Sequence, residues 1–197
     1  MADLRVRTLA DRAATAGNGG RRRSAAPAWT WIGVLAGVWC ATVAVAVAVA
    51  VLPGVASDGR ALLGLHLSAA VNPVPSLGRA AAIALHNVQV AGWPLLLPLL
   101  GVSQRRSVRL LADALVVGSL LVNAGLVGIA LGAYQARLLA FVPQLPIEWA
   151  GLAIGPAAWC DARREPLQHR HLLASAAAMA VLLIAAAIVE TWCVPHR

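Results

Sequence analysis

The chain has 197 residues, of which 60% are hydrophobic and only 12% are charged, and its mean hydropathy is +0.75. These values lie outside the range of soluble globular domains, so they exclude a single domain that folds around a water-driven core. The formal net charge is +8, and all 16 basic residues are arginine. We interpret these arginines as loop residues that orient a membrane protein and contact anionic lipid, rather than as a nucleic-acid site.

The N-terminal quarter of the chain predicts a basic tail and a first membrane span. Residues 1–28 are polar and include the arginine run 21–23, which is typical of a mobile cytoplasmic tail. Residues 29–52 form an apolar segment long enough to cross the bilayer as a helix. A cleavable signal peptide is the alternative, because small residues follow at 55–57, but the apolar segment is longer than that of a typical signal.

Further apolar segments predict additional spans at 80–102, 110–133, 141–160 and 172–192. Each is close to the ~20 residues that cross about 30 Å of hydrocarbon. Residues 61–71 are apolar but too short to cross, so they predict an interfacial or re-entrant helix. The expected fold is all-α, a polytopic integral membrane helix bundle over residues 29–195 with about five transmembrane helices.

The distribution of arginine predicts the orientation of this bundle. A cytoplasmic N-terminus leaves on the outer side only Arg60, Arg79, Arg137 and Arg197. Because cytoplasmic loops carry the excess of basic residues, we expect the N-terminus on the cytoplasmic side of the membrane and the C-terminus on the outer side.

Polar side chains that fall inside the spans are candidate functional residues. They are His86, Asn87, Asn123, Gln144, Glu148 and Glu190. A carboxylate or amide in hydrocarbon costs free energy unless it contacts a partner, a cavity or water. The expected topology places these groups in the outer half of the bilayer, where they would line one polar pocket if the spans pack together. The alternatives are hydrogen bonds between helices for the asparagines and the histidine, and a hydrated interfacial position for Glu190.

Two prolines indicate how the fourth span begins. Pro143 and Pro146 flank Gln144, and Pro146 is suited to the first position of a helix. Glu148 then lies in the first turn, where the positive end of the helix dipole stabilises a carboxylate. Residues 141–145 are expected to form irregular backbone that lines a cavity or is buried in protein.

Glycine pairs spaced four residues apart predict close helix packing at Gly33/Gly37, Gly128/Gly132 and Gly151/Gly155. We interpret these pairs as packing sites within the bundle, with a homodimer interface as the alternative. Cys40, Cys160 and Cys193 lie in or at the ends of different spans and are interpreted as packing residues. His169 and His171 lie in an inner loop without further nearby ligands, so no metal site is predicted. No motif predicts catalysis or a cofactor.

Three short motifs resemble the stage II sporulation protein M family of multi-pass bacterial membrane proteins, over roughly residues 60–195. The matching stretches are His86–Ala91, Asn123–Gly125 with Gly128, and Pro143–Glu148, to which Glu190 near the end of the last span is added. His86 stands where the family usually has asparagine, and Gln144-Leu145 replaces a family His-Gly. The resemblance implies a non-enzymatic protein that holds partner proteins at the membrane, and it makes Glu148 the residue carried over most directly.

Two functions are therefore expected. The first is a membrane scaffold or accessory subunit that recruits other membrane or envelope proteins, with homo-oligomers possible. The alternative is the membrane component of a transporter or exporter, which would act with an ATPase subunit or an ion gradient. Substitution of Glu148 by glutamine distinguishes them, because a scaffold should tolerate it and a proton-coupled carrier should not.

Overall fold

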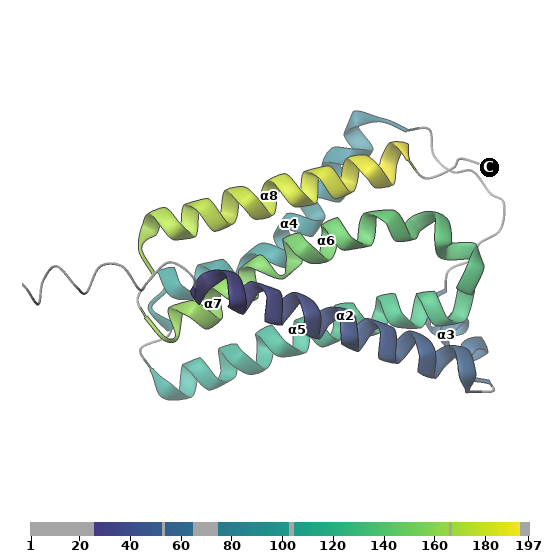
Figure 1. Cartoon of the computed structure of the whole chain (residues 1–197), viewed down its shortest axis with the longest axis horizontal. Helices are drawn as coiled ribbons and strands as arrows, with labels where there is room; N and C mark the ends of the chain where they lie inside the picture. The colour runs from purple at the N-terminus through teal and green to yellow at the C-terminus, as the bar shows by residue number, and fades with distance from the viewer. Residues whose placement is uncertain (1–25, 53, 65–74, 103–104, 166, 194–197) are drawn as a thin grey trace, which may run out of the picture.

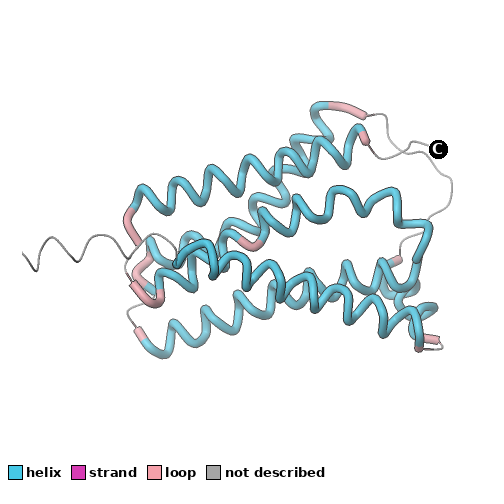
Figure 2. Tube along the Cα trace, viewed as in Figure 1, coloured by secondary structure: helices cyan, strands magenta, loops and turns pink. Residues whose placement is uncertain are grey.

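The computed structural model of the chain describes residues 26–52, 54–64, 75–102, 105–165 and 167–193. Helices account for nearly all of these residues, and the described part contains no strand (Figure 2). In chain order the elements are α2 (Ala26–Val51), α3 (Val55–Leu63), α4 (Leu77–Leu99), α5 (Arg106–Tyr134), the 3-10 helix η2 (Gln135–Gln144), α6 (Leu145–Leu152), α7 (Ile154–Ala162) and α8 (His169–Trp192).

Four helices are long and apolar enough to cross a bilayer, namely α2, α4, α5 and α8. They coincide with the expected spans at 29–52, 80–102, 110–133 and 172–192. The agreement arises because hydrocarbon thickness fixes the length of a spanning helix and lets the apolar run mark its extent. Most of the expected tail, residues 1–25, lies outside the described residues.

Residues 141–160, expected as one span, do not form one continuous helix. They are divided among η2, α6 and α7. Pro156 explains the break between α6 and α7, because it has no N–H to bond the carbonyl of Leu152 four residues earlier. Figure 1 shows α6 and α7 following one another along the bundle, so that together they run from one end of it to the other. The first residue of α2 and the last residue of α8 therefore lie at opposite ends of the bundle.

The start of α6 differs in detail from the expected irregular backbone at 141–145. Helix α5 ends at Tyr134, and the next residue, Gln135, has a positive φ of 47°. From Gln135 the chain continues as the 3-10 helix η2 to Gln144. Helix α6 begins at Leu145 with Pro146 at its N-terminal positions. Pro146 and Glu148 therefore occupy the first turn, as the sequence predicts.

The short helix α3 lies earlier in the chain than the expected helix at 61–71. It ends where Gly64 adopts a left-handed conformation with φ of 57°, which glycine tolerates without strain. Arg60 fixes α3 to the end of α5, because its Nη1 donates to the Ala133 carbonyl at 2.8 Å. Residues 65–71 lie outside the described residues.

The tandem of α6 and α7 forms the centre of the bundle. It packs against α8, α4 and α2, while α2 packs along α5, and α4 packs along α8. Its two tryptophans are almost completely buried, with Trp149 2% and Trp159 1% exposed. This segment is short and broken yet surrounded by helices, so its polar groups lie inside the protein rather than against lipid.

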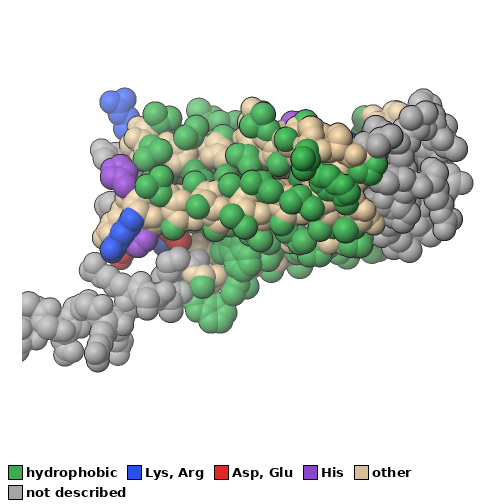
Figure 3. Space-filling view, turned by 90° about the horizontal axis from the view of Figure 1, so that it is seen from above, with side chains coloured by type: hydrophobic (Ala, Val, Ile, Leu, Met, Phe, Trp, Pro, Cys, Tyr) green, Lys and Arg blue, Asp and Glu red, His purple; other side chains and the backbone are tan. Residues whose placement is uncertain are grey.

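Large hydrophobic side chains cover the long sides of the bundle, as the space-filling view shows (Figure 3). Most of the visible basic and histidine side chains gather at the end where α2 and α8 begin. A chain folded in water would bury such an apolar surface. An apolar belt with a charged end is instead the pattern of a protein embedded in a bilayer.

Candidate intramembrane binding site

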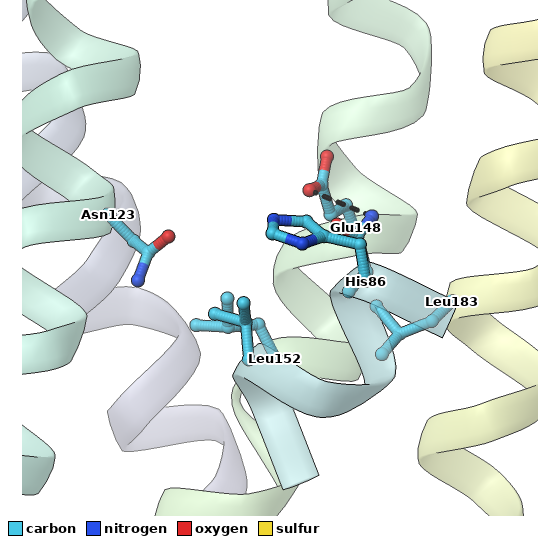
Figure 4. A pocket seen from close by; sticks show the side chains of 7 residues that line it. His86, Asn123, Glu148, Leu152 and Leu183 are labelled. Carbon is cyan, nitrogen blue, oxygen red and sulfur yellow. Dashed lines mark hydrogen bonds between the residues drawn. The ribbon is translucent and has the colours of Figure 1, made fainter. Parts of the chain in front are cut away.

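Seven side chains from four helices enclose a cavity of about 50 Å³ (Figure 4). Helices α4, α5, α6 and α8 contribute His86, Asn87, Val90, Asn123, Glu148, Leu152 and Leu183. A cavity needs roughly 10–15 Å³ to hold one water, so this one accommodates a few waters or a small polar group. Four of the polar residues singled out in the sequence therefore meet at one place.

Glu148 carries the only carboxylate in the cavity lining. Asn87 Nδ2 on α4 donates a hydrogen bond to its Oε1 at 3.3 Å. The first turn of α6 also presents the positive end of the helix dipole to the carboxylate. Among the described residues no cation lies within ion-pair distance of Glu148. The amide and the helix N-terminus are thus its visible stabilising partners.

Asn123 faces the cavity from α5 and is anchored to its own helix. Its Nδ2 donates to the Ser119 carbonyl one turn earlier, at 2.8 Å. The amide is therefore held in one orientation, and Figure 4 shows it projecting from α5 towards His86 and Glu148. This bond uses one of the two N–H groups of the amide, and the side-chain oxygen remains able to accept a hydrogen bond from a ligand.

His86 lies at the mouth of the cavity. Its side chain is exposed at the surface of the bundle, and Figure 4 places its ring between Asn123 and Glu148. This differs from the hydrogen-bonding role inside the bundle that the sequence suggested. The ring instead forms part of the boundary between the cavity and the surroundings of the bundle.

Gln144 and Glu190 do not line the cavity. Gln144 ends η2 and is 8% exposed, and its buried Oε1 has no hydrogen-bond partner among the described residues. Glu190 lies near the end of α8, is partly buried, and is not among the residues that line the cavity. Glu190 therefore belongs to the end of the bundle beyond the cavity.

The glycine pairs have two different environments. A Cβ at Gly128 would approach the Thr42 carbonyl to 2.7 Å, and one at Gly132 would approach the Ala46 carbonyl to 2.5 Å. Gly151 and Gly155 are similarly crowded, by α8 and α4 respectively. Gly33 and Gly37 on α2 instead face open space, unlike the expectation that all three pairs pack within the bundle.

A second polar cluster, at the opposite end from Glu190, was not among the sequence candidates. Trp159 Nε1 donates to Asp113 Oδ1 at 2.9 Å, and Arg163 pairs with the same oxygen at 3.1 Å. Thr30 Oγ1 donates to Asp161 Oδ1 at 2.8 Å, which joins α2 to α7. Asp113 therefore bonds to Trp159 and Arg163 rather than to Arg109, which lies one turn earlier on α5. The sequence feature that could have indicated this cluster is the position of Asp113 and Asp161 near the ends of two spans.

The fold and the site together define a multi-pass helical membrane protein with a polar cavity enclosed by its helices. The described residues contain no group of three or more histidine, cysteine, aspartate or glutamate side chains that could hold a metal. Comparison with known proteins finds no matching family model, no matching curated protein and no matching solved structure.

Proposed function

We propose that this chain is the membrane-embedded component of a transporter and that its cavity binds the positively charged group of a substrate at Glu148. The observation that carries the proposal is the environment of this carboxylate. Glu148 lines an internal cavity, and Asn87 is the one described side chain that donates a hydrogen bond to it. Support comes from charge, since a carboxylate enclosed by protein needs a cation or a proton as its partner.

The energetics support a ligand rather than a purely structural role. Removing a carboxylate from water costs several kcal/mol even after the protein relaxes. A hydrogen bond to a charged group returns about 1.5–3 kcal/mol, and a helix N-terminus about 0.3–1 kcal/mol. These two contributions leave part of the cost uncompensated, and an ammonium or guanidinium group in the cavity would supply the remainder. The Asn123 oxygen would accept one of its N–H groups.

The size of the cavity sets the kind of group that enters. A volume of about 50 Å³ takes the charged head of a substrate but not a whole metabolite. The rest of the substrate would extend past His86 at the cavity mouth. Movement of the substrate would require an ATPase subunit or an ion gradient as the source of energy.

The proposed orientation places the N-terminus in the cytoplasm of a bacterial cell, with α6 and α7 together forming the fourth of five crossings. Six arginines lie at the end where α2 begins: Arg105, Arg106, Arg109, Arg163, Arg164 and Arg170. Cytoplasmic ends carry such an excess of arginine. The cavity, near the start of α6 at the other end, then lies in the outer half of the bilayer.

Binding of small cations to the protein in lipid nanodiscs tests this proposal. Radiolabelled methylammonium and guanidinium are the probes, and saturable binding of at least one is expected. Glu148→Gln should weaken that binding about 30-fold or more, since losing one partner of a buried charge pair costs 2–5 kcal/mol. Glu190→Gln is the matched control and should retain binding. Absence of saturable binding, or equal losses in both variants, would overturn the proposal.

A scaffold is the second candidate function, and the open face of α2 favours it. Gly33 and Gly37 lie on one face of the helix with nothing within 4 Å of an added Cβ. Two glycines at this spacing allow close approach of another transmembrane helix, from a second copy or a partner protein. The motif resemblance to stage II sporulation protein M supports the same function. Cross-linking of tagged protein in native membranes should then recover a membrane or envelope partner, and recovery should survive Glu148→Gln but not Gly33→Ile with Gly37→Ile.

A further inference from the structure

An apolar groove lies next to the cavity, on two of the helices that line it. This α4–α5 groove is lined by Trp93 of α4 and by Ala114, Leu115, Gly118 and Ser119 of α5, and it encloses about 460 Å³. Its lining is almost entirely hydrocarbon and small side chains. Gly118 has nothing within 4 Å of an added Cβ, so the groove is open over this residue.

The groove and the cavity are neighbours on both helices. On α5, Asn123 of the cavity donates to the carbonyl of Ser119, which lines the groove. On α4, Val90 of the cavity precedes Trp93 of the groove by three residues. At 1.5 Å per residue these steps are about 4.5–6 Å along the helix axes. A molecule with its head in the cavity therefore needs only a short extension to reach the groove.

The side chains of α4 and α5 that face outwards beside the groove and the cavity are apolar. Leu115 is 55% exposed and Val122 60% exposed on α5, and Leu85 is 60% exposed on α4. In a bilayer such side chains contact lipid tails. A molecule would therefore enter the groove from the hydrocarbon, with its polar head passing His86 at the cavity mouth.

We infer that the site binds a single-chain amphipathic amine, with its ammonium group at Glu148 and its alkyl chain in the α4–α5 groove. The inference rests on the proposed function for the Glu148 end of the site. Charge complementarity selects the class: the Glu148 carboxylate attracts an ammonium, repels a fatty acid carboxylate and repels a phosphate headgroup. The cavity volume also excludes a phospholipid headgroup, whereas a primary ammonium fits.

The length of the groove sets the length of the chain. Asn123 and Ala114 are nine residues apart on α5, which is about 13 Å along the helix. An extended chain advances roughly 1.2 Å per bond, so about eleven carbons cover this distance. Dodecylamine is therefore the probe of choice. In the groove its tail exchanges lipid contacts for protein contacts of similar apolarity, so the groove positions the chain rather than adding much affinity.

Photolabelling in nanodiscs tests this inference. The probe is dodecylamine with a diazirine near the end of its chain, and labelled residues are mapped by mass spectrometry. Labelling is expected on α4 and α5 along the groove, and dodecylamine but not dodecanol should compete. Gly118→Leu fills the groove where space is open and should reduce this labelling about tenfold, because the leucine side chain displaces the probe chain from the groove into lipid. Gly33→Leu, on the open face of α2, is the matched control and should leave it unchanged.

The small-cation assay separates failure of this inference from failure of the proposed function. Gly118→Leu should still bind methylammonium as the parent protein does, which also shows that the variant is folded. If methylammonium binds but the diazirine probe labels all lipid-facing helices evenly, the groove inference is wrong and the proposed function stands. If neither probe binds in a Glu148-dependent manner, both are wrong.

Discussion

Alanine at Gly128 and Gly132 tests the packing of α2 on α5, the most extensive helix contact in the molecule. An added Cβ would lie 2.7 Å from the Thr42 carbonyl oxygen at Gly128 and 2.5 Å from the Ala46 carbonyl oxygen at Gly132. Both obstacles are backbone atoms of α2, which cannot rotate away as a side chain can. Helix α2 must therefore move outward to accept either methyl group.

The magnitude follows from the cost of overpacking. A methyl group forced into a closely packed site costs typically 1–3 kcal/mol. The two sites lie one turn apart against the same helix, so the first substitution relieves part of the clash at the second. We expect the double variant to lose about 2–4 kcal/mol of its free energy of unfolding.

Equilibrium unfolding provides the assay. Protein in mild detergent is titrated with sodium dodecyl sulfate, and the seven tryptophans report unfolding by fluorescence. The matched control replaces Gly33 and Gly37 with alanine, where an added Cβ has no neighbour within 4 Å. The control should not lose stability, since alanine favours a helix over glycine. Equal losses for the two pairs, or a loss confined to the control pair, would refute the described packing of α2 on α5.

Two further substitutions examine the ends of the bundle. Trp159→Phe removes the hydrogen bond from the indole to Asp113 and should cost about 1.5–3 kcal/mol in the same titration, because the acceptor is charged. Trp149→Phe is its control, since the equally buried Trp149 Nε1 has no partner among the described residues and its loss breaks no hydrogen bond. At the other end, Arg60→Leu should lower the hydrogen-exchange protection of α3 while leaving α5 unchanged, because Arg60 bonds α3 to α5; unchanged protection of α3 would contradict that anchoring role.

The sequence predicts the location and length of the apolar helices much better than it predicts the direction of a side chain around a helix axis. Apolar runs located the long helices because bilayer thickness constrains span length. The same reasoning treated 141–160 as one span, since average hydropathy does not register that Pro156 removes a backbone donor from the middle of a helix. The proline was visible in the sequence, but its effect needed helix geometry rather than composition.

The candidate site shows the same division. All six polar candidates lie in described helices, yet the cavity includes Asn123 and excludes Gln144 and Glu190. Whether a side chain reaches a cavity depends on the rotation of its helix, which packing against neighbours fixes. Single polar residues in long apolar helices leave that rotation undetermined. The undetermined rotation of the helices is also the reason why the α4–α5 groove and the cluster around Asp113 and Asp161 were not predicted.

The boundary between η2 and α6, within the fourth crossing, links the fold to the site. A continuous helix through residues 141–160 would place Glu148 in its second or third turn, where the backbone N–H groups are already bonded to carbonyls. Because η2 ends at Gln144 and α6 begins at Leu145, Glu148 lies in a first turn, where the helix dipole is most favourable to negative charge. Short helices whose ends lie inside a membrane protein commonly supply charge to a binding site. In the proposed function the end of α6 favours the charged form of Glu148, so the ligand that complements the cavity is a cation.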